Sequence, residues 1–243
     1  MTEHVWVFGD SFAEKWVDPE VDGKPAWPIM LENKFFVENF AKCGSGPDYQ
    51  LDLLYKKLTD PNVNLNKLKD INLIFVLSHN ARIDFSFLTE PSHQVYVTKL
   101  THDNHKTWKD QPVDIQRIFC KYEKYSDFVT DFYKFYYFHQ TYEIDVFKRI
   151  ALLKDIAMLF KKVLVIPVFD NIEDFRLYKL LHKRNVVENF YIATGDGIGW
   201  ISSPNPTDAN HFTQENHYEF YFMLKGWIEK NINLSTKRLK KSA

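Results

Sequence analysis

The amino-acid sequence predicts an α/β fold with a five-stranded, mainly parallel sheet. Short apolar runs alternate with segments of helical periodicity, which is typical of strands connected by crossover helices. Three of the runs consist almost entirely of Val, Ile, Leu and Phe, as expected for strands that helices cover on both faces. The length of 243 residues and the 45% share of hydrophobic residues are enough for one large core.

Five runs are predicted to be strands. Val5–Phe8, Ile71–Leu77 and Val163–Val168 are the nearly continuous apolar runs, and we expect them to be internal strands of the sheet. Phe35–Phe40 and Asn189–Ala193 have a more mixed composition, which favours positions nearer the edges.

Four segments carry apolar residues at helical spacing. They are Asp48–Leu58, Tyr142–Phe160, Asp174–His182 and a final segment from about Thr213 to Ile232. The inward side of the final helix is predicted to comprise Tyr218, Tyr221, Phe222, Leu224 and Ile228.

Residues 83–140 interrupt the alternation between the third predicted strand and the long helix. This stretch is rich in aromatic residues, and a loop of such length without structure is uncommon in a compact domain. We therefore expect a partly helical insertion within a single domain spanning 1–235, followed by a basic tail at 236–243. Trp108 and the aromatic residues after it are predicted mainly to form the insertion's own core. The alternative is that they bind a sugar ring or an acyl chain.

Composition argues against several function classes. The net charge of −1 gives no general attraction to nucleic acid, and a short basic tail is typical of a solvated terminus. Cys43 and Cys120 lack the spacing of a zinc site. The sequence shows no signal-peptide pattern and no apolar stretch of about 20 residues that would span a membrane. We therefore expect a cytoplasmic protein without a metal, an organic cofactor, a nucleic-acid partner or a membrane span. Its oligomeric state stays open.

Gly9-Asp10-Ser11 directly follows the first predicted strand. Ligands of open parallel sheets bind beyond the carboxyl ends of the strands, so a serine on a tight turn at this position is exposed to a ligand. The glycine permits the turn, and the amides that open a following helix can hold a negatively charged oxygen. Asp10 is expected to fix the turn and not to act as a second catalytic carboxylate.

Asp208 and His211 lie in a polar segment just before the final predicted helix. A serine hydroxyl is a poor nucleophile at neutral pH and needs a base, which in turn needs an orienting carboxylate. An aspartate and a histidine three residues apart in one loop can supply both groups.

Two further segments follow the second and third predicted strands. Asn39 to Gly46 contains Gly44, whose backbone N–H can approach a substrate closely, and Gly46 is an alternative. Asn80 has a side-chain amide that can donate to a developing oxyanion. Arg82 lies just beyond it and is predicted either to meet an acidic group of the substrate or to pair with a neighbouring carboxylate.

The order Gly-Asp-Ser, Gly, Asn and Asp-x-x-His resembles that of the SGNH hydrolases, also called GDSL-like lipases and acylhydrolases, from Val5 to roughly Leu224. The resemblance implies a three-layer α/β/α, flavodoxin-like fold and hydrolysis of a carboxylic ester, with a small-molecule or carbohydrate ester as substrate. It implies Ser11 as nucleophile, His211 as base and Asp208 as the carboxylate that orients it. It also implies an oxyanion hole made of the Ser11 and Gly44 amides and the Asn80 side chain.

The sequence departs from the family pattern in its third block, which reads Ser78-His79-Asn80-Ala81 in place of Gly-x-Asn-Asp. This departure leaves an alternative open, namely a non-catalytic carbohydrate-binding or structural protein that retains the fold. The Gly-x-Ser-x-Gly motif of the α/β-hydrolases is absent, which disfavours that separate family.

Overall fold

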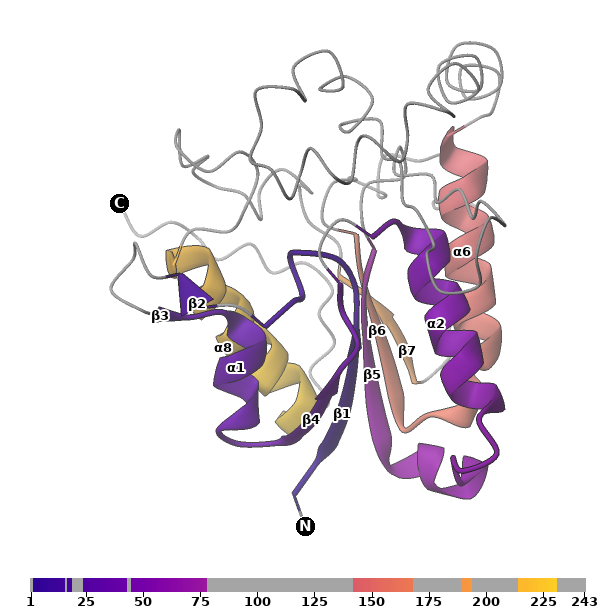
Figure 1. Ribbon diagram of the computed structural model, residues 1–243, viewed down its shortest axis with the longest axis horizontal. Helices are drawn as coiled ribbons and strands as arrows, with labels where there is room; N and C mark the ends of the chain where they lie inside the picture. The colour runs from indigo at the N-terminus through magenta and orange to yellow at the C-terminus, as the bar shows by residue number, and fades with distance from the viewer. Residues whose placement is uncertain are drawn as a thin grey trace, which may run out of the picture.

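A five-stranded parallel sheet forms the centre of the structure (Figure 1). The computed structural model describes residues 2–15, 17–18, 24–42, 45–77, 142–167, 189–193 and 214–230. The strand order is β4-β1-β5-β6-β7, and each of the four neighbouring pairs is parallel. The predicted α/β class with a parallel sheet is therefore confirmed. The strands are β1 (His4–Phe8), β4 (Phe36–Asn39), β5 (Ile71–Leu77), β6 (Lys162–Pro167) and β7 (Phe190–Ile192).

The predicted division into internal and edge strands is also confirmed. Every residue of β5 and β6 is buried, as continuous apolar runs require. β4 and β7 lie at the two edges and are only partly buried, and Phe36 of β4 is 58% exposed.

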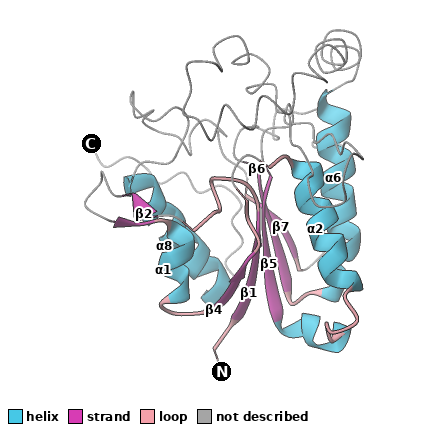
Figure 2. Cartoon of the chain, viewed as in Figure 1, coloured by secondary structure: helices cyan, strands magenta, loops and turns pink. Residues whose placement is uncertain are grey.

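Helices cover both faces of the sheet and give three layers (Figures 1 and 2). α1 (Trp27–Glu32) and α8 (Gln214–Lys230) lie on one face, and α2 (Pro47–Thr59) and α6 (Tyr142–Ile156) lie on the other. Side chains alternate along β1. Val5 and Val7 therefore pack in the core on the α1 and α8 side of the sheet, and Trp6 and Phe8 pack in the core on the α2 and α6 side. Shorter elements complete the described parts: the antiparallel pair β2 (Val17–Asp18) and β3 (Lys24–Pro25), and the 3₁₀ turns η1 (Leu65–Asp70) and η6 (Ala157–Leu159).

Three of the four predicted helices are present. The segment 48–58 is α2, 142–160 is α6 followed by η6, and the final segment is α8 over its described residues. The fourth prediction, Asp174–His182, lies outside the described residues, as do the insertion at 83–140 and the basic tail at 236–243. None of the helices in the described ranges is long and apolar enough to cross a membrane.

The predicted inward side of α8 is wrong at two positions. Tyr218 is 43% exposed and Phe222 is 64% exposed. The helix has apolar residues around most of its circumference, so its hydrophobic pattern does not define one face, and packing against α1 and the sheet selects another stripe. The buried side chains of α8 are Asn216, His217, Phe220, Leu224, Trp227 and Ile228.

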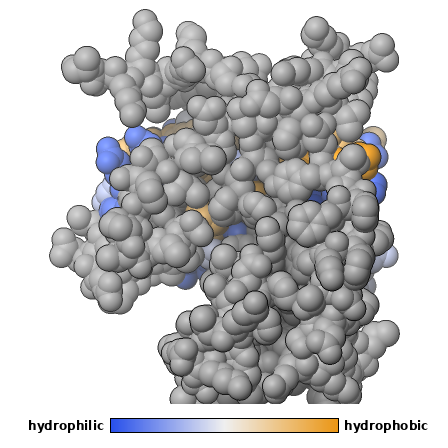
Figure 3. Space-filling view, turned by 90° about the horizontal axis from the view of Figure 1, so that it is seen from above, coloured by the Kyte–Doolittle hydropathy of each residue, from blue (hydrophilic) through white to orange (hydrophobic). Residues whose placement is uncertain are grey.

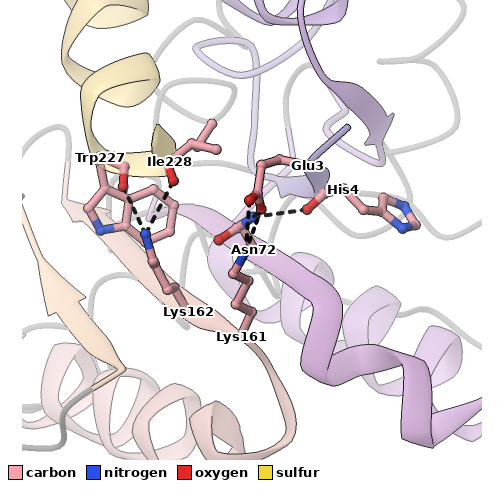
Figure 4. A network of polar contacts seen from close by, with 7 residues as sticks. All are labelled: Glu3, His4, Asn72, Lys161, Lys162, Trp227 and Ile228. Atoms are coloured by element: carbon pink, nitrogen blue, oxygen red, sulfur yellow. Dashed lines mark hydrogen bonds and ion pairs between the residues drawn. The ribbon is translucent and has the colours of Figure 1, made fainter. Parts of the chain in front are cut away.

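A polar network joins the amino ends of the strands to the end of α8 (Figure 4). The ammonium group of buried Lys162 donates to the carbonyl oxygens of Trp227 and Ile228 at 3.1 and 3.2 Å, and so caps the last turn of the helix. Burial lowers the pKa of Lys162 below its ordinary value, and the charge of Lys161 acts in the same direction. Lys161 itself binds both carboxylate oxygens of Glu3 at 2.8 Å.

Glu3 gives this network a defined pH dependence. Burial by itself would raise its pKa, but hydrogen bonds from Lys161 and Asn72 bring the pKa below the ordinary value. The folded chain therefore binds the Glu3 proton less tightly than the unfolded chain does. The resulting stabilisation is present above about pH 4.5, the ordinary pKa of the group, and is lost as the pH falls through the pKa of the folded state.

We predict that Glu3→Gln lowers the free energy of unfolding at pH 7 by about 1 kcal/mol or less, the range of partly exposed ion pairs. It should also make the loss of stability below pH 4.5 less steep. Urea unfolding followed by tryptophan fluorescence at a series of pH values measures both effects. Val63→Ala, which removes partly buried apolar surface and no ionisable group, is the control and should leave the slope unchanged. An unchanged slope in Glu3→Gln would contradict the prediction.

Candidate active site

Ser11 lies on a tight turn just beyond the carboxyl end of β1. The Asp10 carboxylate accepts a hydrogen bond from the Phe12 amide at 3.1 Å, and the Asp10 carbonyl oxygen accepts one from the Ala13 amide at 2.9 Å. Asp10 thus makes the turn-fixing contact expected of it. Ser11 is 5% exposed, and no residue in the described ranges forms a hydrogen bond with its hydroxyl group.

Gly9 allows the chain to approach its neighbours closely at the start of this turn. A Cβ atom at this position would lie 2.8 Å from the Cβ atoms of both Ala13 and Val76. The φ angle of Gly9 is +157°, at the limit of the region that favours glycine. A larger residue would push the turn away from β5, because Val76 belongs to that strand.

The end of β4 and the residues that follow it are bound directly to the Ser11 turn. The side-chain amide of Asn39 donates to the carbonyl oxygen of Ala13 at 2.7 Å, and its oxygen accepts from the Ala41 amide at 2.8 Å. The Lys42 amide donates to the carbonyl oxygen of Gly9 at 3.0 Å. Both ends of the 9–13 turn are therefore held by this segment.

Gln50, in the first turns of α2, extends the connection through its fully buried side chain. Its Oε1 atom accepts from the Gly9 amide at 3.1 Å, and its Nε2 atom donates to the Ser45 hydroxyl oxygen at 2.6 Å. That hydroxyl donates to the Lys42 carbonyl oxygen at 2.7 Å. The contacts form a closed ring through Gly9, Gln50, Ser45 and Lys42.

Trp27 connects the opposite face of the sheet to the same turn. Its indole Nε1 donates to the Phe12 carbonyl oxygen at 2.7 Å, and its backbone amide donates to the Nδ1 atom of His217 at 3.4 Å. Both side chains are almost completely buried. The first turn of α8, which contains His217, is thereby linked to the residue that follows Ser11.

The predicted site residues fall into two groups. Gly9, Asp10, Ser11 and Gly46 lie in the described parts of the chain. The residues that lie outside them are Gly44, Asn80, Arg82, Trp108, Asp208 and His211. The grouping of these six with Ser11 stays a prediction. Within the described ranges, no group of three or more His, Cys, Asp or Glu side chains is arranged to hold a metal ion.

Sequence reasoning missed Gln50, Ser45 and Trp27 as partners of the Ser11 turn. Gln50 offered one signal, because it is a polar residue next to apolar positions in a predicted helix. Ser45 and Trp27 offered none that distinguishes them from ordinary loop and core residues. Figure 3 views the molecule from this end, where the visible described residues include both hydrophilic and hydrophobic surface.

Comparison with known proteins gives distant similarities of fold. No family model matches the sequence, and no curated protein matches it. An alpha/beta hydrolase from the metagenome of Lake Arreo, Spain, is 11% identical with a TM-score of 0.44, over 96% of this chain and 97% of that one. An acetylxylan esterase from Geobacillus stearothermophilus is 12% identical with a TM-score of 0.41, over 97% of both chains. Similarity this weak does not indicate an activity for this chain.

We predict that Trp27→Phe destabilises the chain more than Trp227→Phe does, by about 1 kcal/mol, the net value of a typical hydrogen bond. Both indoles are fully buried, so both substitutions remove the same volume. Only Trp27 donates its Nε1–H to a described residue, whereas the Nε1 atom of Trp227 has no hydrogen-bond partner in the described part of the chain. Urea unfolding of the two variants measures the difference. Equal losses would contradict the prediction.

Proposed function

We propose that this chain is a serine esterase of the SGNH type that cleaves a carboxylic ester. The observation that supports this most strongly is the strand order around β1. β1 carries Ser11 just beyond its carboxyl end, and its two neighbours in the sheet are β4 and β5. Gly44 follows β4 and Asn80 follows β5, so the proposed oxyanion donors come from the strands on either side of the nucleophile.

The base belongs to the segment that leads into α8. His211 precedes the first residue of α8, Gln214, by three positions, and the first turn of α8 is bonded through His217 and Trp27 to the Ser11 turn. These contacts favour an approach of Asp208 and His211 to Ser11 from the α1 and α8 side of the sheet.

The proposed reaction has two stages. In the first, His211 takes the proton of the Ser11 hydroxyl as its oxygen attacks the ester carbonyl carbon, while Asp208 holds the imidazole in the correct tautomer. The tetrahedral oxyanion accepts hydrogen bonds from the Ser11 and Gly44 amides and the Asn80 side chain, each worth roughly 3–4 kcal/mol. His211 then protonates the leaving alcohol, and the acyl group stays on Ser11.

In the second stage, a water molecule attacks the acyl-enzyme and gives its proton to His211. The tetrahedral intermediate collapses, the carboxylic acid leaves, and the Ser11 oxygen regains its proton from His211. The proposed substrates are small esters, including acetyl or acyl groups on a carbohydrate, with Arg82 and Trp108 as substrate contacts.

We predict that Ser11→Ala lowers kcat for a short-chain aryl ester by about 10⁴-fold or more, because the nucleophile is lost while the fold stays intact. A fluorophosphonate probe should modify wild-type Ser11 and leave the variant unlabelled, as peptide mapping by mass spectrometry would show. Wild-type turnover by Ser11→Ala, or modification of another serine with Ser11 untouched, would remove the central claim. A wild-type chain that binds acetylated sugars without hydrolysing them would favour the non-catalytic alternative.

We predict that His211→Ala abolishes both turnover and fluorophosphonate labelling, because it removes the base proposed to deprotonate Ser11. His4→Ala is the matched control, since His4 lies at the amino end of β1 and binds Glu38 at 2.7 Å. That variant should retain the activity of the wild type at a temperature where both are folded. Activity that survives His211→Ala would mean that another residue is the base.

A further inference from the structure

We propose that Gln50 is a positioning residue, which holds the turn that bears the nucleophile at a fixed distance from the loop that bears the second oxyanion donor. This inference rests on the proposed esterase function. It assigns a role to a residue that lies outside the predicted catalytic motifs.

The Gln50 carboxamide is fully buried, and a buried amide without partners is strongly unfavourable. Its oxygen and its nitrogen are used for two different segments: the oxygen binds the Gly9 amide at 3.1 Å, and the nitrogen binds the Ser45 hydroxyl at 2.6 Å. The side chain therefore joins the turn after β1 to the loop after β4.

Gly9 is held from both sides by this arrangement. Its N–H is bound by Gln50, while its carbonyl oxygen accepts from the Lys42 amide at 3.0 Å. The peptide groups on either side of Gly9 are thus fixed, and Ser11 follows two residues later. A rotation of these peptides would move the Ser11 oxygen and its amide together.

Ser45 lies between the two glycines that are candidates for the oxyanion donor, Gly44 and Gly46. The contact from Gln50 therefore restrains the residue that is adjacent in sequence to both glycines. An oxyanion donor acts only if its distance to the developing charge is correct, and that distance here spans two separate segments of chain. Gln50 bonds to both segments, to Gly9 in the first and to Ser45 in the second.

Removing the two hydrogen bonds of the Gln50 side chain should weaken stabilisation of the transition state more than substrate binding. Gln50→Met keeps the length of the side chain and removes both hydrogen bonds. We expect kcat for a short-chain aryl ester to fall about 10- to 100-fold, as for a displacement of reacting groups by about 1 Å, with KM changed less than about twofold. The rate of fluorophosphonate labelling of Ser11 should fall in parallel.

Asn189→Leu is the matched structural control. The Asn189 amide also joins two segments, donating to the carbonyl oxygens of Ala157 and Phe160 at 2.6 and 3.1 Å, but these contacts lie at the amino end of β7. This variant should lower Tm and leave kcat unchanged. If Gln50→Met does not fold, Ser45→Ala can be tested in its place. It removes the bond between Gln50 and Ser45 and keeps the bond between Gln50 and Gly9, so a smaller fall in kcat is expected.

The possible outcomes separate this proposal from the proposed function. A wild-type chain that neither hydrolyses the ester nor reacts with the probe at Ser11 overturns both. An active wild type, together with a Gln50→Met variant that loses Tm but keeps kcat, as Asn189→Leu does, overturns the positioning role alone. A loss of kcat that exceeds the change in KM, absent from the Asn189→Leu control, supports it.

Discussion

The close approach of the chain at Gly9 is the constraint on which the candidate site depends. The turn after β1 folds back so tightly that Ala13 and Val76 together occupy the space that a Cβ atom would need. The backbone there lies against β5 on one side. On the other side, the Gly9 N–H donates to the Gln50 side chain of α2, and the Gly9 carbonyl oxygen accepts from the Lys42 amide in the segment after β4. The turn after β1 therefore packs against β5 and is hydrogen-bonded to the segment after β4. Ser11 lies two residues after Gly9, so the contacts that fix the backbone of Gly9 also fix the position of Ser11.

The two ends of the sheet are built differently. At the amino ends, charged side chains pair with one another and with the end of α8, as in the contacts of Lys161 with Glu3 and of Lys162 with Trp227 (Figure 4). At the carboxyl end of β1, the contacts of the described residues include hydrogen bonds between the backbone and amide, hydroxyl or indole groups, together with the Asp10 carboxylate and the His217 imidazole. The ion pair of Glu3 with Lys161 and the helix cap formed by Lys162 thus lie at the end of the sheet opposite the candidate site. The turn that carries the proposed nucleophile is bound directly by the Gln50 and Asn39 side-chain amides and the Trp27 indole, which do not titrate near neutral pH.

The strands could be predicted from sequence because burial on both faces leaves a mark in the sequence itself. β5 and β6 are apolar throughout, and the mixed composition of β4 correctly placed it at an edge. Helix faces were harder to predict. α8 has apolar side chains on both sides, and only packing against α1 decides that Trp227 is buried while Phe222 is exposed. α1 has six residues, too few for a helical period to show, and it was missed.

The same distinction explains what could be predicted of the site. Ser11 could be placed because its position relative to a strand is a local property of the chain. The contacts of Gln50 and Trp27 join residues 41 and 15 positions apart in sequence, and no local pattern encodes such a pairing. Motif residues carry the chemistry, and the residues between them set the distances. Because Trp27 binds the turn from one face of the sheet and Gln50 binds it from the other, the position of Ser11 is fixed by both cores at once. A family pattern that records only the motifs therefore omits the contacts that bring those motifs together.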